Sequence, residues 1–189
     1  MDIRKIDAVV INHAEIDHSG ALKDLLALIP GVPVYCTHNG VKSLKGHFHQ
    51  DWNFKPVRTG DTLDVGNGKK LVFIEAAMLH WPDTMFSYLT GDNILFSTDA
   101  FGQHMATDRI WADLVDPCIL WEEAIKYYAN IIAPWGKSVE AKLKEFKAMN
   151  VPVDMICPSH GACWRGGDIA RVIEKYTAWA SAYREDRIA

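Results

Sequence analysis

Short apolar runs alternate with helical repeats of apolar residues over the first part of the chain. Residues 6–11 are mostly apolar and rich in β-branched side chains, which predicts a buried strand. Residues 19–29 carry leucines at helical spacing, and Ser19 is placed to cap the helix that they predict. Residues 32–36 predict a second strand, and residues 39–45 predict a short helix. The chain therefore opens with strands and helices in alternation.

Paired strands dominate the middle of the chain. The Gly-Asn-Gly segment at residues 66–68 is a strong hairpin signal between the apolar runs 62–65 and 71–75, which we expect to pair. Residues 85–89 and 94–97 predict a second pair of the same kind.

The last third of the chain returns to helices. The spacing of apolar residues predicts helices over 120–131, 138–149 and 168–183, with a strand at 153–157 between the second and the third. Strands thus first alternate with helices, then pair as hairpins, then alternate again. Layered sheets flanked by helices fit this order, so we expect an α/β fold.

Composition excludes several classes of protein. The 189 residues are 49% hydrophobic, which is enough for one well-filled core, and the net charge of −4 offers no footprint for nucleic acid or an anionic membrane. No apolar run is long enough to span a membrane and no signal peptide is evident, so we expect a cytoplasmic protein. The four cysteines form no Cys-x-x-Cys motif, and we expect buried, reduced thiols at Cys36, Cys118, Cys157 and Cys163.

Candidate metal ligands are concentrated directly after the first predicted strand. The segment His13-Ala14-Glu15-Ile16-Asp17-His18 places four potential ligands within six residues. A loop at the end of a strand can turn such neighbouring side chains toward one point, whereas a regular helix or strand cannot. A solvated polar loop is the simpler explanation, but two histidines interleaved with two carboxylates favour metal binding.

Three further candidates lie at or near the ends of other predicted strands. His80 follows residues 71–79, Asp99 follows 94–98, and His160 comes shortly after the strand at 153–157. Each taken alone has a structural explanation, such as a hydrogen-bonded core histidine or an ordinary cap. Together with the first segment, their positions favour one shared metal site.

These residues carry a resemblance to a known family. His-x-Glu-x-Asp-His, followed by His80, Asp99 and His160, resembles the metallo-β-lactamase superfamily and, within it, the diiron domain of flavodiiron proteins. The segments LHWPDTMFSYLTGDNILFSTDAFGQH and VDMICPSHG are similar to that subgroup, and the resemblance covers essentially the whole chain. It implies a four-layer (α+β) metallo-β-lactamase-like αβ/βα sandwich.

The resemblance also implies that residues 1–189 are a partial diiron domain. The N-terminal strands of the sandwich would precede it, and a flavodoxin-like FMN domain would follow a junction at residues 184–188. Missing strands would leave sheet edges and an apolar face uncovered, which predicts a homo-oligomer.

The resemblance implies which residue binds which iron. It assigns His13, Glu15 and His80 to one iron, and Asp17, His18 and His160 to the other, with Asp99 and an oxygen or hydroxide as bridges. In some members of the family the residue that matches His18 stays off the metal. The zinc hydrolases of the superfamily have histidine where Glu15 stands, and the added carboxylate favours iron, although zinc can substitute.

The resemblance implies an oxidoreductase that reduces nitric oxide to nitrous oxide, dioxygen to water, or both. Electrons would come from FMN, fed by a rubredoxin-type donor. No catalytic residue beyond the metal ligands and no residue that binds a flavin is expected here. The alternatives are a dinuclear zinc hydrolase and a non-catalytic metal-binding remnant.

Other residues that could contribute to a site receive simpler interpretations. We expect His47 and His49 to lie in a surface loop near the rim of the site. His104 is either a donor to a metal ligand or an exposed loop residue. Trp52 and Trp81 are interpreted as core or interface residues.

Overall fold

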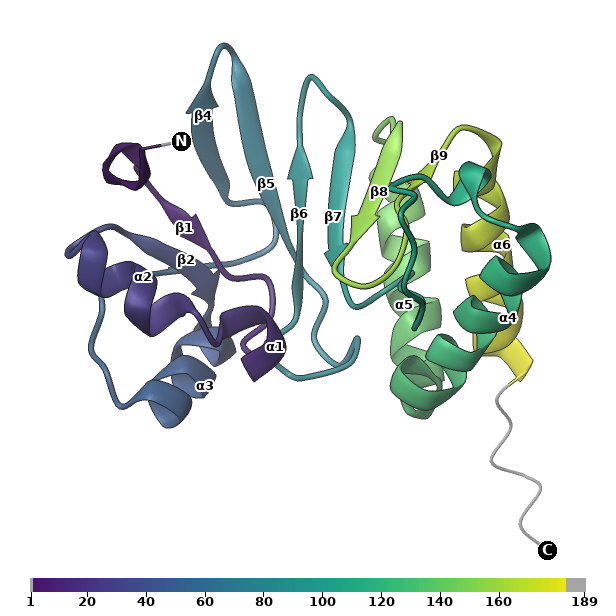
Figure 1. Cartoon of the computed structure of the whole chain (residues 1–189), viewed down its shortest axis with the longest axis horizontal. Helices are drawn as coiled ribbons and strands as arrows, with labels where there is room; N and C mark the ends of the chain where they lie inside the picture. Colours follow the sequence, from purple (N-terminus) through teal and green to yellow (C-terminus); the bar gives the residue numbers. More distant parts are fainter. Residues whose placement is uncertain (1, 183–189) are drawn as a thin grey trace, which may run out of the picture.

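Two sheets face each other, and helices cover the outer side of each (Figure 1). The computed structural model describes residues 2–182, so the predicted junction at 184–188 lies outside the described residues. Side chains of both sheets pack where the sheets meet: the rings of Tyr35 and Phe73 stack with centroids 5.9 Å apart, beside Val57 and Met85. The predicted α/β sandwich is confirmed.

The first sheet contains three parallel strands in the order β1-β2-β3. Its strands are β1 (Val9–Val10), β2 (Val34–Thr37) and β3 (Phe54–Val57). Its associated helices are η1 (Ile3–Lys5), α1 (Ile16–Ser19), α2 (Leu22–Leu28) and α3 (His38–Phe48). The sequence did not predict β3, because this short, largely exposed segment contains a proline and becomes a strand only by pairing with β2.

The single helix predicted from Ser19 is wrong. The Ser19 hydroxyl donates to the carbonyl of Ala14 at 2.8 Å and caps nothing, so a short α1 precedes a separate α2. Helix α3 is longer than predicted, and Thr37 caps it by accepting a hydrogen bond from the amide of Gly40. His47 therefore belongs to the last turn of a helix instead of a loop.

The second sheet has six strands in sequence order. They are β4 (Thr62–Gly66), β5 (Lys69–Glu75), β6 (Met85–Leu89), β7 (Ile94–Thr98), β8 (Met155–Pro158) and β9 (Trp164–Arg165). Both predicted hairpins are confirmed, since β4 pairs with β5 and β6 with β7 in antiparallel fashion. Strands β7 and β8 are parallel and joined by a long helical crossover, and the short β9 was not predicted.

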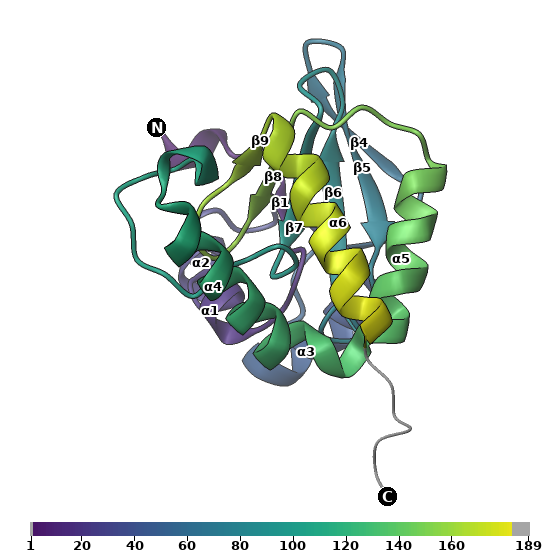
Figure 2. The same cartoon turned by 90° about the vertical axis from the view of Figure 1, so that its right-hand side faces the viewer.

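The helices of the crossover and the C-terminus cover the outer face of the second sheet (Figure 2). They are η2 (Ala112–Leu114), α4 (Pro117–Tyr127), the π-helical turn η3 (Tyr128–Ile132), η4 (Ala133–Trp135), α5 (Gly136–Ala148) and α6 (Gly167–Ala182). Asp116 caps α4, with Pro117 at the first helical position. In the described part of the chain, no helix is long and apolar enough to cross a membrane.

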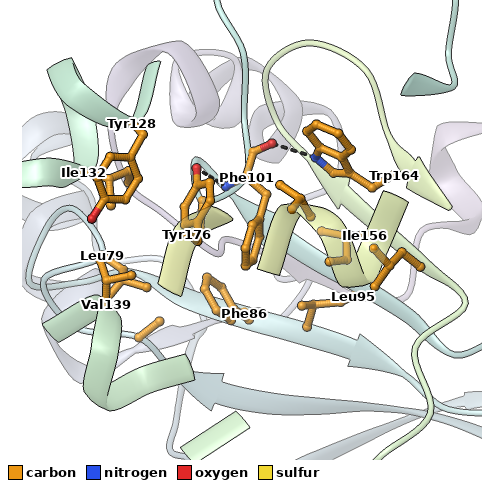
Figure 3. Packing of buried hydrophobic residues seen from close by; sticks show 14 of the residues in the cluster. Leu79, Phe86, Leu95, Phe101, Tyr128, Ile132, Val139, Ile156, Trp164 and Tyr176 are labelled. Carbon is orange, nitrogen blue, oxygen red and sulfur yellow. Dashed lines mark hydrogen bonds between the residues drawn. The ribbon is translucent and has the colours of Figure 1, made fainter. Parts of the chain in front are cut away.

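The largest core lies between the second sheet and these helices (Figure 3). At the centre of this core, two side chains form hydrogen bonds with the backbone of Phe101. The indole N–H of Trp164 donates to the Phe101 carbonyl at 2.8 Å, and the Phe101 amide donates to the hydroxyl of Tyr176 at 2.7 Å. Phe101 lies two residues after Asp99, so this buried clamp fixes the turn that presents the Asp99 carboxylate.

Candidate metal centre

All seven predicted ligands converge from four separate segments of the chain, and the segment expected to be a loop includes the short helix α1. His13 follows β1, and Glu15, Asp17 and His18 lie at or in α1. His80 lies between β5 and β6, Asp99 follows β7, and His160 lies between β8 and β9. Strand β5 ends at Glu75, as predicted, and His80 lies in the loop from 76 to 84 that follows it.

Two groups of three side chains form within this cluster. In the first group, the Nε2 atoms of His13 and His80 lie 3.1 and 3.2 Å from Oε2 of Glu15. In the second, the Nε2 atoms of His18 and His160 lie 3.5 and 3.2 Å from Oδ2 of Asp17. The ligand atoms of each group lie within 4.8 Å of one another, close enough to share one metal ion.

The carboxylate of Asp99 lies between the two groups. Its Oδ2 is 3.7 Å from Nε2 of both His13 and His80. Its Oδ1 is 3.1 Å from Nε2 of His18 and 3.2 Å from Nε2 of His160. Each oxygen therefore faces a different group, which is the orientation that a carboxylate bridging two ions requires.

Burial divides the cluster into a floor and a rim. The side chains of His13 and Asp99 are 0% and 3% exposed, whereas those of Glu15 and Asp17 are 38% and 48% exposed. The floor is thus shielded from water, and the rim is open enough for a small molecule to enter.

Electrostatic coupling is strong at the floor. Burial alone would raise the pKa of Asp99, but hydrogen bonding to His18 and nearby imidazoles hold that pKa well below its usual range. The hydrogen bond to Asp99 raises the pKa of His18. Burial lowers the pKa of His80, which favours the neutral imidazole that a metal ion needs.

The donor set fits two divalent cations. Four imidazole nitrogens face three carboxylates, which carry a charge of −3 when ionised. Holding three carboxylates this close together, with Asp99 buried, is costly without a counter-charge, so bound cations would stabilise the cluster. Mixed imidazole and carboxylate donors suit iron.

Asp83 is a site residue that the sequence did not indicate. Its Oδ2 accepts a hydrogen bond from the Ala14 amide at 2.7 Å and lies 3.2 Å from Nδ1 of His13. Burial alone would lower the pKa of His13, but Asp83 and the other carboxylates nearby raise it. Asp83 orients His13 so that Nε2 faces the cluster. In many metal sites a carboxylate that does not bind the metal orients a histidine ligand in this way, by accepting a hydrogen bond from its other ring nitrogen. A carboxylate three residues after His80 was the available signal, and it is not specific.

We expect Asp83→Asn to weaken metal affinity by roughly 10–100-fold, the usual effect of removing an outer partner of a histidine ligand. The change keeps the size of the side chain but removes the charge that fixes His13. Metal affinity would be measured by competition with a chelator. Asp92→Asn, which removes a partly exposed partner of Lys69, is the control and should leave affinity unchanged. Equal affinities for wild type and Asp83→Asn would contradict a role in orienting His13.

Tyr127 also contacts the cluster. Its hydroxyl donates a hydrogen bond to Oδ1 of Asp99 at 3.0 Å. Burial and the neighbouring Asp99 raise its pKa, so the phenol stays protonated at neutral pH. The sequence predicted a helix over 120–131, which contains Tyr127, but it did not indicate this contact.

Gln103 holds the Asp99 turn against the loop that carries His160. Its side-chain amide donates to the carbonyl of Phe101 at 2.8 Å, and its Oε1 accepts from the amide of Ala162 at 2.7 Å. The Gln103 backbone amide also donates to the His160 carbonyl at 3.1 Å. Gly161 has a φ of 82°, and a Cβ there would collide with Gln103, so only glycine suits this position.

The remaining aromatic candidates are divided between the rim and the core. His104 is exposed, with its ring 4.5 Å from that of Tyr127 and 6.4 Å from that of His160. Trp81 is half-buried, and its ring lies 5.1 Å from that of His13 and 6.4 Å from that of His47, beside the predicted ligands. Trp52 packs in the small core beside the first sheet, as expected.

Comparison with known proteins finds a matching family model and several similar proteins. The model of the ODP family beta lactamase matches residues 1–161. The chain is 55% identical over all 189 residues to the anaerobic nitric oxide reductase flavorubredoxins of Aliivibrio salmonicida and Aeromonas hydrophila, and it spans 38% of the length of each. The resemblance to flavodiiron proteins is therefore confirmed.

Solved structures agree. The rubredoxin oxygen:oxidoreductase of Desulfovibrio gigas superposes with a TM-score of 0.91 at 34% identity, over 96% of this chain and 45% of that one. The flavodiiron protein of Giardia intestinalis superposes with a TM-score of 0.88 at 36% identity, over 94% of this chain and 43% of that one. With the family model matching most of its length, the chain belongs to the ODP family of β-lactamase-like proteins.

Proposed function

We propose that this chain is the diiron domain of an oxidoreductase that reduces nitric oxide to nitrous oxide, dioxygen to water, or both. The observation that carries the proposal is the position of Asp99, whose two oxygens face two separate groups of imidazole and carboxylate donors. The relatives named as nitric oxide reductases and the oxygen oxidoreductase of similar fold support it.

In this proposal each group holds one iron. His13, Glu15 and His80 would hold the first, His18, Asp17 and His160 would hold the second, and Asp99 would be shared between the two. Ferrous iron held by these residues would supply the electrons for the reduction. Two molecules of nitric oxide, two electrons and two protons give one molecule of nitrous oxide and one of water.

The residues around the ligands position the site and control access to it. Asp83 fixes the ring of His13, and Tyr127 donates to Asp99 from the buried side. The open rim at Glu15 and Asp17 admits a small gas without a dedicated binding pocket. The protein side chains thus serve as ligands and positioning groups, and none is required as a nucleophile.

The proposal includes partners that re-reduce the site. These are an FMN carried by a flavodoxin-like domain and a rubredoxin-type donor, as the names of the relatives suggest. It also includes the assignment of residues 1–189 to one diiron domain, a homo-oligomer, and a cytoplasmic location.

A single-turnover experiment tests the function. The chain would be loaded with ferrous iron under anaerobic conditions, given one pulse of nitric oxide, and assayed for nitrous oxide. We expect about one nitrous oxide per pair of irons, the limit set by two one-electron donors. Adding NADH alone should not restart the reaction.

Two outcomes would contradict parts of this proposal. No nitrous oxide from protein with both irons bound would favour a metal-binding remnant. Continued turnover with NADH and no added redox protein would show that electrons do not depend on a separate FMN partner. The Asp113→Asn variant, changed at a half-exposed ion pair with Arg165 away from the predicted ligands, should behave as wild type.

Glu15 is the residue that argues against a zinc hydrolase. We expect Glu15→His to shift metal preference toward zinc, because it exchanges a hard, charged oxygen for a neutral imidazole. Iron and zinc bound after loading from an equimolar mixture would be measured by elemental analysis. Glu122→His, on the exposed face of α4, is the control. An unchanged ratio of iron to zinc in Glu15→His would show that Glu15 does not set the metal preference. Hydrolysis of a lactam or thioester by the zinc-loaded wild type would favour the dinuclear zinc hydrolase instead.

A further inference from the structure

Two cysteines face each other across the hairpin that carries His160. Strands β8 and β9 are antiparallel, with Met155 opposite Arg165 and Ile156 opposite Trp164. The next pair in this register is Cys157 with Cys163. Ile156 and Trp164 are fully buried against the helices, so the alternation of side chains puts both cysteines on the other face of the hairpin.

The backbone geometry of this pair suits a disulfide. The amide of Cys163 donates to the Ile110 carbonyl at 2.7 Å, and its carbonyl accepts from the Ala112 amide at 2.9 Å. Because these bonds point away from β8, Cys157 and Cys163 form a non-hydrogen-bonded pair. The Cα atoms of such pairs lie about 4.5 Å apart. Disulfides span Cα distances of roughly 4.4–6.8 Å.

The two thiols already interact. A hydrogen bond from the Cys157 thiol lowers the pKa of Cys163 to about 7, although partial burial opposes the shift. The lowered pKa favours the nucleophilic thiolate form of Cys163 over that of an ordinary buried thiol. Cys163 is only partly buried, and it lines a surface cavity of about 390 Å³ together with Met105, Arg109 and Gly161. By contrast, burial raises the pKa of Cys36 to about 12.

The expectation of four buried thiols is met at Cys36 alone. Cys118 is exposed, and Cys157 and Cys163 are half-buried.

We propose that Cys157 and Cys163 form a redox modification site, which small disulfides of the glutathione class convert to an intramolecular disulfide. The Cys163 thiolate attacks one sulfur of glutathione disulfide, forms a mixed disulfide and releases one glutathione thiolate. The Cys157 thiol then loses its proton and attacks the Cys163 sulfur, which releases the second glutathione. The protein loses two electrons and two protons, and both glutathiones leave in the reduced form.

This disulfide would lie at the base of the loop that carries a predicted iron ligand. The ring that it closes spans residues 157–163 and contains His160. Oxidation would therefore restrict the loop between β8 and β9, independently of the contacts that Gln103 makes with it.

Mass spectrometry of tryptic peptides tests the proposal. The full chain would be incubated with glutathione disulfide, trapped with an alkylating agent and digested without reduction. Cys157 and Cys163 fall in one peptide, residues 148–165, and Cys118 falls in another, residues 110–126. We expect the first peptide to lose the mass of two hydrogens and to carry neither glutathione nor the alkylating agent. Exposed Cys118 has no partner thiol and should carry one glutathione, which shows that the oxidant is active.

Variants separate a disulfide from simple adducts. In Cys157→Ser, the peptide should carry one glutathione on Cys163, because the resolving thiol is gone. Cys118→Ser should leave the oxidation of the pair unchanged. Two glutathiones on the wild-type peptide, or two alkylated cysteines while Cys118 is modified, would overturn the proposal. A thermal melt of each variant would confirm that the serine substitutions leave the fold intact.

Discussion

Replacing Asp99 with asparagine is expected to prevent the chain from binding two metal ions at once. The Asp99 side chain is 3% exposed, and its oxygens lie 3.1–3.7 Å from the Nε2 atoms of four histidines. The amide keeps the shape of the side chain but removes the charge and one of the two oxygens that face the two groups. The remaining carboxylates carry one negative charge fewer against the same two cations, so the second ion loses both a ligand and a counter-charge.

The expected loss of metal affinity exceeds the roughly 10–100-fold weakening caused by removing a hydrogen-bond partner of a ligand. The reason is that Asp99 is proposed as a direct ligand of both ions. Elemental analysis after dialysis should find at most one iron per chain, compared with two for wild type. The Asp113→Asn variant removes a carboxylate of the same type from a half-exposed ion pair and should retain both ions. Two tightly held irons in Asp99→Asn would exclude Asp99 as the bridge.

Truncating Trp164 to alanine is expected to cause a large loss of stability. The side chain is fully buried, and its ring lies 5.1 Å from that of Trp121. Removing a buried tryptophan costs about 3–5 kcal/mol through lost contacts and the cavity left behind. For a domain of this size, that corresponds to a fall in the melting temperature of roughly 6–20 °C. The free energy of unfolding would be measured by denaturant titration of the metal-free chain.

Two further variants divide this effect into packing and hydrogen bonding. Trp164→Phe keeps most of the ring but loses the hydrogen bond to the Phe101 carbonyl, so it should lose about 1 kcal/mol for the bond, with a further loss for the smaller ring. Ile119→Ala, at a side chain 54% exposed, should change stability by less than about 0.5 kcal/mol. If Trp164→Ala melted at the temperature of Ile119→Ala, the core around Phe101 would not be the main source of stability.

Local signals in the sequence determined much of the fold. The hairpin at residues 66–68 was predictable because Gly66, Asn67 and Gly68 all adopt positive φ, which glycine and asparagine tolerate. The other hairpin and the main helices followed from apolar periodicity, and their boundaries were correct to within a few residues. The predicted ligands could be named because four of them lie within one short segment and the motif resembles a known family.

Only the tertiary structure decided which other residues complete the site. Asp83 meets His13 from 70 positions away, and Tyr127 meets Asp99 from 28 positions away. Such contacts depend on how the sheets and helices pack, and no local spacing encodes them. The same holds for β3 and β9, since neither short segment has a strong strand pattern and each becomes a strand by pairing with its neighbour. The sequence thus determined the chemistry available to the protein through residue type and local spacing. Packing over long sequence separations decided which side chains orient the ligands, and which cysteines face each other beside them.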